Sequence, residues 1–260
     1  MLGRSRMGVL LAGAIGLFLL LPLVAVVPFS FTAKRFLSLP DGDYSLRHYR
    51  ALLDADTWLA SIGTSALIAI LSSIVATLLA TAFALGVWLL RPRLAKVLTG
   101  LVLLPIIVPP VTSAVSIYFL LAQIGLLDTI AGVIIGHVVV TVPFAVVAIM
   151  TALNRMDRTL DQAARILGAD PFQSIFLVIL PNIRFGLFTA WFISLVMSWE
   201  ESSVTLFISG VNVTTLPKRM WDNLRLDLDP AIAAISVLMT VMTALVIILR
   251  GRRQQSEAQA

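Results

Sequence analysis

Long uninterrupted blocks of apolar residues dominate the pattern along the chain, and polar residues gather in the segments between them. About 20 consecutive apolar residues are enough for a helix to cross a bilayer. Blocks of that kind lie at residues 7–31, 59–90, 98–122, 130–153, 183–208 and 231–249. No run alternates polar and apolar residues as the strands of an outer-membrane barrel do. The pattern predicts an all-α membrane protein with six transmembrane helices.

The first block follows Arg4 and Arg6, as the apolar part of a signal peptide would. Its apolar run is longer than the roughly 7 to 15 residues of such a part, and no convincing small-residue cleavage site follows. We therefore expect residues 1–31 to form a retained N-terminal anchor helix. A loop at 32–57, a five-helix core at 58–250 and a polar tail at 251–260 complete the expected organisation.

Composition narrows the class further. The chain has 260 residues, of which 59% are hydrophobic and 13% are charged, whereas an average soluble domain is about a quarter charged. Cysteine is absent, which excludes disulfides, a thiolate nucleophile and a cysteine metal site. Two histidines, His48 and His137, leave little for a histidine-based site, so we expect no metal site.

The charged residues predict an orientation, because short cytoplasmic loops carry an excess of Lys and Arg. With both termini inside, the inner segments hold 12 of the 19 basic residues, and the outer segments hold 8 of the 14 acidic residues. The positive surplus is then wholly cytoplasmic. A net charge of +5 therefore reflects topology, and we expect no nucleic-acid partner.

The inner segment 154–182 is too long for a simple connection and carries helix signals of its own. Thr159 and Gln162 have the spacing of a capping box at a helix start. Gly168 suits the left-handed residue that ends a helix. We expect a short amphipathic helix between them.

A second helix is predicted directly after it. Asp170 precedes Pro171 as an N-cap precedes the first turn, and Gln173 occupies the box position. This helix is expected to end at Pro181. On spacing alone, a helical hairpin resting on the membrane interface explains the segment equally well.

Residues 161–181, DQAARILGADPFQSIFLVILP, resemble the EAA signature of the permeases of binding-protein-dependent ABC importers. In that signature an EAA triplet, a glycine and a terminal Leu-Pro have fixed separations. The matching positions here are Ala163, Ala164, Gly168, Leu180 and Pro181. Gln162 stands where the family usually has Glu and removes one negative charge, for which Asp161 next to it could partly substitute.

The resemblance implies the type I ABC importer permease fold, with the segment as a coupling helix that docks in a groove of a cytoplasmic ATPase. The implied coupling residues are Gln162, Ala163, Ala164, Gly168, Ala169, Leu180 and Pro181. The implied setting is the bacterial inner membrane, and the implied partners are a second permease, identical or similar, and two ATPase subunits. A periplasmic solute-binding protein would sit on the outer segments 32–57 and 211–230.

The chain itself contains no Gly-rich phosphate-binding loop of the Walker type. ATP and Mg²⁺ would therefore bind to the partner ATPase, and we expect no cofactor in this chain. Nucleophile elbows and zinc-protease helices are also absent from the sequence. We expect a transport subunit without catalytic residues.

Glu200 and Glu201 lie inside the fifth apolar block, where an ionised side chain costs a few kcal/mol unless it faces protein or water. Neighbouring residues on a helix point about 100° apart, so both cannot line one narrow path equally. A cargo role competes with a kink, an ion pair with Lys218 or Arg219, or a helix that ends earlier than drawn. Trp199 could offer a cation–π face or belong to an interfacial belt.

Residues 198–210, SWEESSVTLFISG, resemble the corresponding stretch of polyamine and related permeases, which carry an acidic residue or pair there. The following stretch, 215–236, resembles that branch as well. The resemblance implies a polyamine, opine or related amine as cargo. An acidic pair suits a cationic amine electrostatically.

Other features have simpler interpretations. The proline-containing run 104–110 breaks the third block and is expected to kink it. Gly132 and Gly136 permit close helix packing within the subunit, and His137 beside them is expected to be a hydrogen-bonded packing residue. Three tryptophans near block boundaries fit an interfacial belt: Trp58, Trp88 and Trp221.

Two alternatives to an ABC permease stay open on the sequence. A secondary transporter driven by an ion gradient would show inverted repeats, and no clear repeat of about three spans is visible. An intramembrane enzyme would need a nucleophile with a base, and none is evident.

Overall fold

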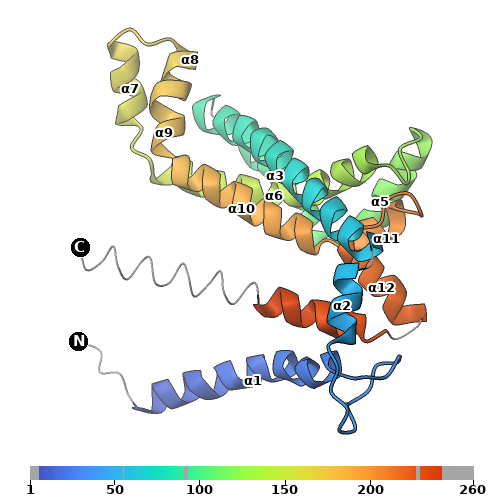
Figure 1. Ribbon diagram of the computed structural model, residues 1–260. Coiled ribbons are helices and arrows are strands. Elements are labelled where there is room, and N and C mark those ends of the chain that lie inside the picture. Colours follow the sequence, from blue (N-terminus) through green and yellow to red (C-terminus); the bar gives the residue numbers. More distant parts are fainter. Residues whose placement is uncertain (1–5, 55, 91–92, 227–228, 242–260) are drawn as a thin grey trace. The chain divides into compact units, whose positions relative to one another are not determined.

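The computed structural model describes residues 6–54, 56–90, 93–226 and 229–241 (Figure 1). Within these ranges the regular structure is helical, and a single isolated antiparallel bridge joins Thr32 to Tyr44. The predicted all-α class is confirmed. The expected tail at 251–260 and the end of the sixth block, 242–249, lie outside the described residues.

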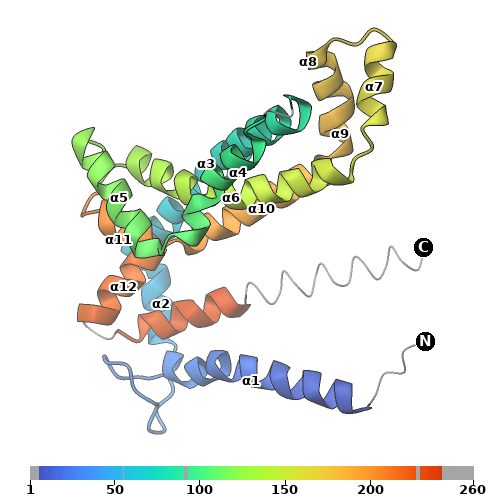
Figure 2. The same cartoon turned by 180° about the vertical axis from the view of Figure 1, so that it is seen from behind.

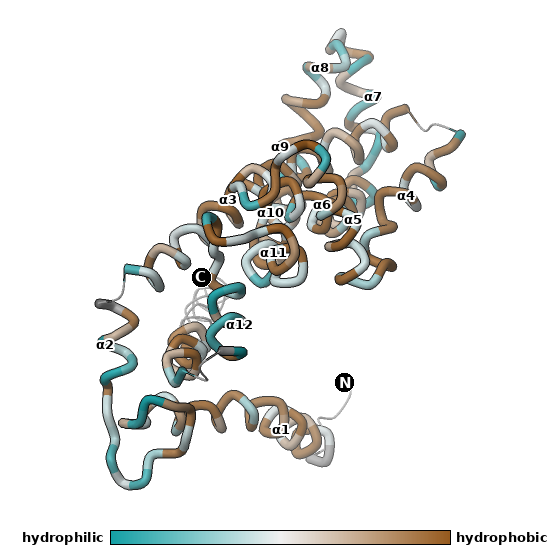
Figure 3. Tube along the Cα trace, turned by 90° about the vertical axis from the view of Figure 1, so that its right-hand side faces the viewer, coloured by the Kyte–Doolittle hydropathy of each residue, from teal (hydrophilic) through white to brown (hydrophobic). Residues whose placement is uncertain are grey.

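Three of the described helices are long and apolar enough to cross a membrane unbroken. They are α1 (Arg6–Ser30), which is apolar from Gly8, α3 (Asp56–Leu90) and α6 (Ile130–Arg155). In Figure 3 most of α1 has hydrophobic colouring. Their bounds agree with the first, second and fourth apolar blocks.

Two further stretches form bent pairs of helices. The first pairs α4 (Ala95–Ile107) with α5 (Pro110–Gln123) at 106°. The second pairs residues 171–182 with α10 (Arg184–Glu200) at 73°. An apolar helix at Ala231–Val241 is shorter than a span within the described residues, so the exact count of six stays a prediction.

The chain divides into two compact units, one of residues 1–60 and 219–260 and one of residues 61–218. In the first unit, the expected loop 32–57 contains the helix α2 (Arg47–Asp54). Tyr49 on α2 donates to the Ser30 hydroxyl at 2.7 Å, and the ring Nε2 of the buried His48 lies 3.0 Å from the Lys34 carbonyl oxygen. These contacts hold α2 to the end of α1 and to the segment that follows it.

In the second unit, hereafter the core unit, α3, α6 and α10 run lengthwise beside one another (Figures 1 and 2). A helical hairpin occupies one end, which we call the hairpin end. It consists of α7 (Thr159–Ile166), α8 (Pro171–Gln173), the π-helical segment Ser174–Ile179 and α9 (Leu180–Asn182). The opposite end holds α5 and α11 (Ser203–Ile208), and α12 (Leu216–Leu226) follows in the chain.

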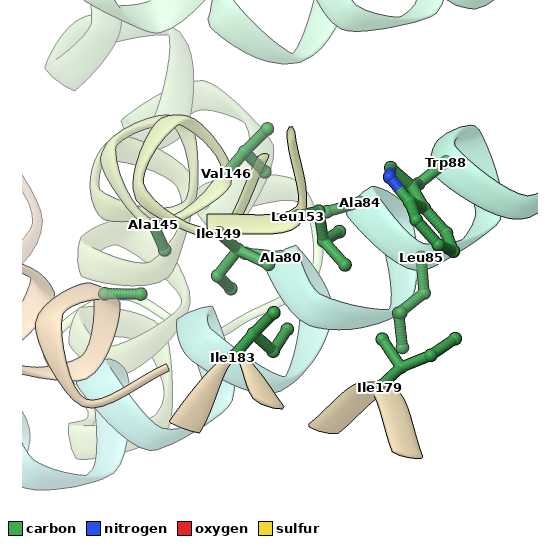
Figure 4. Packing of buried hydrophobic residues seen from close by; sticks show 11 residues of the cluster. Ala80, Ala84, Leu85, Trp88, Ala145, Val146, Ile149, Leu153, Ile179 and Ile183 are labelled. Carbon is green, nitrogen blue, oxygen red and sulfur yellow. The ribbon is translucent and has the colours of Figure 1, made fainter. Parts of the chain in front are cut away.

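A buried apolar cluster fixes the hairpin end of the three long helices (Figure 4). Small side chains such as Ala80 and Ala84 of α3 let the larger Ile149 and Leu153 of α6 pack closely against them. The hairpin contributes Ile179, the bend before α10 contributes Ile183, and α10 contributes Ala190. The hairpin is therefore built onto the core through its second helix.

Trp88 belongs to this cluster and is only 6% exposed. An interfacial belt requires a ring exposed to the lipid headgroups, so the belt interpretation is wrong for Trp88. It is wrong for Trp58 too, which is 7% exposed. Periodicity alone placed both rings near helix ends but could not tell which side of the helix meets a neighbour.

A second buried cluster holds the opposite end of the core unit together, where α5, α6 and α11 meet. A Cβ at Gly136 would lie 2.7 Å from Val204 Cγ1 and 2.9 Å from Ile208 Cδ1, so α11 reaches α6 only because that position is glycine. A Cβ at Gly132 would lie 2.1 Å from the Leu126 carbonyl oxygen. The expectation of close packing within the subunit is confirmed.

Candidate functional site

The turn at Gly168 closes the hairpin as the sequence predicts. Gly168 has a φ of +92°, which a residue without a Cβ adopts at little cost. Its amide donates to the Arg165 carbonyl at 3.0 Å, and the Ala169 amide donates to the Ala164 carbonyl at 3.0 Å. This pair of bonds is a Schellman motif, which satisfies the last carbonyls of α7.

The capping box predicted at Thr159 is wrong. Thr159 is the first residue of α7, and its own amide donates to Asp157 Oδ1 at 2.9 Å. The Asp157 carboxylate, two residues earlier, caps the helix instead, and a carboxylate is a stronger acceptor than the Thr159 hydroxyl. The hydrogen bonds from Thr159 hold the pKa of the Asp157 carboxyl below its usual value.

The second helix begins as predicted. Asp170 Oδ1 accepts from the Gln173 amide at 2.8 Å, and Gln173 Oε1 accepts from the Asp170 amide at 3.0 Å, which completes a capping box. The helix continues through a π-helical segment and ends at Asn182, one residue after the expected Pro181. Its chain then bends into α10 at Ile183.

The tip of the hairpin presents apolar side chains outward. Ile166 is 85% exposed and Leu167 is 88% exposed, and α7 contributes no buried residue. Of the predicted coupling residues, Gln162, Ala163, Gly168 and Pro181 are exposed, and Ala164, Ala169 and Leu180 are half-buried. An apolar tip of this kind suits a partner surface better than water.

Asp161, which the sequence offered as a partial substitute for the family's Glu, is bonded within the hairpin. Its Oδ1 accepts from the Ser174 hydroxyl at 2.5 Å and from Arg165 Nε at 3.0 Å. The carboxylate is thus directed into the hairpin. The idea that Asp161 substitutes for the family's Glu toward a partner is corrected by this geometry.

The acidic pair lies at a helix end rather than inside a continuous span. α10 ends at Glu200, and Glu201 is extended, with a φ of −68° and a ψ of 112°. Glu201 Oε1 then accepts the Val204 amide at 2.9 Å at the start of α11. Of the alternatives left open by the sequence, the early helix end is the one observed, and the fifth block 183–208 is two helices.

The environments of the two carboxylates differ. Glu201 is half-buried and lines a cavity of about 140 Å³, whereas Glu200 is exposed and is not among the residues that line it. Pro105 and Pro110 line the same cavity, because α4 and α5 break between them. The kink predicted at 104–110 is confirmed, and the two sequence features meet at one place. Trp199 is half-buried and does not line the cavity.

His137 ties the two helices that flank the acidic pair. Its Nδ1 lies 2.8 Å from Ser198 Oγ on α10, and its Nε2 lies 2.9 Å from Thr205 Oγ1 on α11. The ring is 2% exposed. The prediction of a hydrogen-bonded packing residue is confirmed, and this contact holds the segment that carries Glu201.

A larger cavity of about 640 Å³ lies toward the hairpin end. It shares Ile106 and Phe144 with the smaller cavity. Polar groups reach it from Arg155 and Asn182. The two cavities therefore adjoin along α6, with an apolar pair of side chains between them.

Asp128 joins two loops at the opposite end of the core unit, a contact that the sequence did not predict. Its carboxylate accepts the backbone amides of Gly210, Val211, Asn212 and Val213 at 2.6 to 3.0 Å. Burial raises the pKa of Asp128, but the hydrogen bonds from these four amides outweigh it and leave the pKa below its usual value. The loop after α11 is thereby pinned to the turn before α6.

Among the described residues, no group of three or more His, Asp or Glu side chains is placed to hold a metal ion. The arrangement instead provides two adjoining cavities along bent helices and a surface hairpin.

Comparison with known proteins gives a family match. Residues 76–254 match the model of the family described as binding-protein-dependent transport system inner membrane component. The spermidine/putrescine permease PotC of Haemophilus influenzae is 25% identical over 89% of this chain and 90% of its own length. The putrescine permease PotI of Escherichia coli K12 is 28% identical over 85% of this chain and 81% of its own length.

Other similar proteins have different cargoes. A probable molybdenum ABC transporter permease of Haloferax volcanii is 30% identical over 93% of this chain and 88% of its own length. Among solved structures, a chain of a bacterial ABC transporter involved in import of the acidic polysaccharide alginate matches with a TM-score of 0.71. It is 15% identical and covers 97% of this chain and 99% of its own length, which shows a shared fold.

Proposed function

Because the chain belongs to the family of binding-protein-dependent transport system inner membrane components, we propose that it forms the pathway by which an ATP-driven importer takes up a small amine cation. The chain is a membrane-spanning permease subunit of an ABC importer, and it is a transport component rather than an enzyme. Proteins of this family work with ATPase and solute-binding partners.

The observation that carries the cargo proposal is the Glu201 carboxylate on the small cavity. A half-buried carboxylate at a break between helices attracts a cation and repels an anion. One of its oxygens caps α11, and a carboxylate has further lone pairs for an ammonium group. The polyamine permeases among the relatives are consistent with this proposal.

The cargo proposal is tested by ligand-binding calorimetry on the partner solute-binding protein, with putrescine, spermidine and molybdate as probes. The proposal expects binding of the amines and none of molybdate. Binding of molybdate alone would overturn it. Molybdate is the informative competitor because a relative with 30% identity is described as a molybdenum permease.

The proposed assembly consists of this chain, a second similar or identical permease, two ATPase subunits and a periplasmic solute-binding protein. ATP and Mg²⁺ bind to the ATPase subunits in this proposal. The chain lies in the bacterial inner membrane with both termini in the cytoplasm. The charge distribution of the sequence supports this orientation.

We propose further that the exposed turn at Gly168 and the small face of α7 dock on the ATPase. The test is Gly168→Asp, which places a Cβ at a φ of +92° and a negative charge at the end of α7 where the helix dipole disfavours it. We expect the variant to insert into the membrane and to lose transport. Unchanged uptake would remove the docking assignment.

The matched control is Gly125→Asp. Gly125 also has a positive φ, +69°, and open space around its Cβ position, but it lies in the turn before α6 at the opposite end of the core unit. The same backbone strain and charge should leave uptake close to that of the unmodified protein. Equal loss in both variants would point to misfolding instead of lost docking.

A further inference from the structure

The first helix of the hairpin has no fully buried apolar side chain. α7 has no buried residue, and its largest apolar side chains point outward. A helix that receives force from a partner must nevertheless be attached firmly to the element that it moves. The attachment of α7 therefore has to be found among its polar side chains.

One attachment joins α7 to the second helix of the hairpin. The Ser174 hydroxyl donates to Asp161 Oδ1 at 2.5 Å. Ser174 is completely buried and is the first residue of the π-helical segment. The Asp161 side chain is only 14% exposed, although it lies on a helix whose other residues are exposed or half-buried. A short hydrogen bond to a charged acceptor is among the stronger polar contacts in proteins.

Charged groups on α7 and at its N-cap stabilise this carboxylate in its ionised form. Arg165 Nε lies 3.0 Å from Asp161 Oδ1. Burial raises the pKa of Asp161, but the hydrogen bonds from Ser174 and Arg165 and the charges of Arg165 and Arg158 outweigh it, so the pKa lies below the usual value. The acceptor therefore stays charged at neutral pH.

A second attachment joins the start of α7 to α3. The Arg158 guanidinium lies over the ring of Trp88, 4.4 Å from its centroid. Trp88 is part of the buried cluster at the hairpin end of the core unit, and Ile179 of the hairpin packs in the same cluster (Figure 4). Both attachments therefore lead from α7 into one rigid group of packed side chains.

We propose that the Asp161–Ser174 hydrogen bond and the Arg158–Trp88 stack are the ties through which movement of α7 reaches the membrane helices. The proposal rests on the proposed docking of α7 on the ATPase. Asp161, Ser174 and Arg158 are positioning residues in it, since they touch neither cargo nor nucleotide. Weakening the ties lets the docked helix move without moving α3 and the π-helical segment, so ATP is hydrolysed with less transport.

The test measures ATP hydrolysis and putrescine uptake together in proteoliposomes that contain the complete complex. Asp161→Asn and Ser174→Ala should lower the number of putrescine molecules imported per ATP at least about fivefold, within the usual range of coupling between two sites. ATPase subunits should stay bound and ATP hydrolysis should continue. A ratio equal to that of the unmodified complex overturns the proposal, and so does loss of the ATPase subunits from the variant complexes.

Two control variants separate the ties from general changes. Asp157→Asn removes the same charge from the same segment, but Asp157 only caps α7 and is exposed. Ser116→Ala removes a hydroxyl that is bonded to its own helix on α5. Both should keep the ratio of the unmodified complex. A fall as large as that of Asp161→Asn would overturn the assignment.

A reversible bridge provides an independent test, because the chain contains no cysteine. The double variant Asp161→Cys with Ser174→Cys lacks the hydrogen bond when reduced. It regains a link when a short bis-methanethiosulfonate joins the two sulfurs, since each thiolate then forms a disulfide and releases methanesulfinate. We expect a low import ratio in the reduced complex and a higher one after bridging. Equal ratios in the two states contradict the proposal.

The outcome for the unmodified complex distinguishes this inference from the function on which it rests. If the unmodified complex imports no putrescine in the presence of ATP, the proposed function fails. If it does, and the variants import as much per ATP, only the ties are refuted.

Discussion

Glu200 and Glu201 illustrate how adjacent residues acquire different roles from the backbone between them. The helix ends at Glu200, which leaves that side chain exposed, and the extended backbone at Glu201 directs the next carboxylate to the cavity. The sequence identified the pair, since charges are rare in apolar blocks. It could not choose between them, because that choice depends on where the helix ends.

Glu201→Gln is predicted to weaken uptake of an amine cargo, whereas Glu200→Gln is not. The glutamine keeps an oxygen that can accept the Val204 amide, so the start of α11 is preserved while the charge is lost. A hydrogen bond to a charged group is worth about 1.5 to 3 kcal/mol, which corresponds to a KM for uptake that is about tenfold higher or more. The check is the uptake rate against cargo concentration for both variants, and equal effects would contradict the assignment.

Asp128 could not have been selected from the sequence. The four amides that it binds lie 82 to 85 residues later in the chain, and one aspartate in a loop carries no local signal. A Cβ at Gly210 would lie 2.7 Å from Asp128 Oδ2, so this contact also depends on a glycine. Such long-range contacts are visible only in the folded chain.

The lowered pKa of Asp128 predicts a dependence on acid. A group whose pKa is lower in the folded state stabilises that state above its unfolded pKa, about 3.9, and the contribution is lost as the pH falls through the folded value. The thermal midpoint of the purified protein should therefore change little from pH 8 to 5 on account of this group and fall below about pH 4. Asp128→Asn should show a smaller fall over the same acid range, and an identical pH profile would contradict this role.

Helix breaks differ in how clearly the sequence predicts them. Pro105, Pro109 and Pro110 remove backbone donors, so the break between α4 and α5 is predictable. The break after Glu200 has no proline or glycine beside it, since the nearest are Gly186 before it and Gly210 after it. It is set by the tertiary contacts of α11 with α5 and α6. The periodicity of apolar residues along the sequence does not reveal such contacts.

The cap at the start of α7 is a local contact between residues two apart, whereas the π-helical segment coincides with a contact across the hairpin. Asp157 and Thr159 are both possible caps for that helix start, and the Asp157 carboxylate is the cap observed. The π-helical segment begins where Ser174 meets Asp161 across the hairpin. By contrast, Gly168 and Asp170 form local motifs within a few residues, and both were predicted correctly.

Packing of α11 on α6 predicts a strong effect of a single methyl group. Gly136→Ala would place a Cβ within 3 Å of Val204 and Ile208 side-chain atoms, and overpacking of this kind costs about 1 to 3 kcal/mol. The thermal midpoint in detergent should fall. Gly86→Ala on α3 meets open space and should be neutral or slightly stabilising; similar losses in both variants would contradict the packing account.

The molecule as a whole combines apolar helices with charges that are sorted along the chain. The composition and blocks predicted a helical membrane protein, and family and fold comparisons agree. The bend after Glu200, the two clusters and the cavities required the structure, because apolar residues that face lipid and those that face protein have the same hydropathy. The side chains of α1, for example, are largely exposed although the helix is uniformly apolar.

The orientation can be tested because the chain has no cysteine. Val211→Cys, at a position 93% exposed, should react with a membrane-impermeant maleimide on intact spheroplasts. Ile166→Cys, at a position 85% exposed, should react only after the membrane is permeabilised. The reverse order of labelling would invert the proposed topology.

Reconstituted uptake decides whether the chain acts as the permease of an ATP-driven importer. The complete complex is placed in proteoliposomes with its solute-binding protein and putrescine, with ATP supplied on the ATPase side and no ion gradient. The account predicts uptake that requires both ATP and the binding protein. Uptake by the permease alone, driven by a proton or sodium gradient and indifferent to ATP, would contradict it.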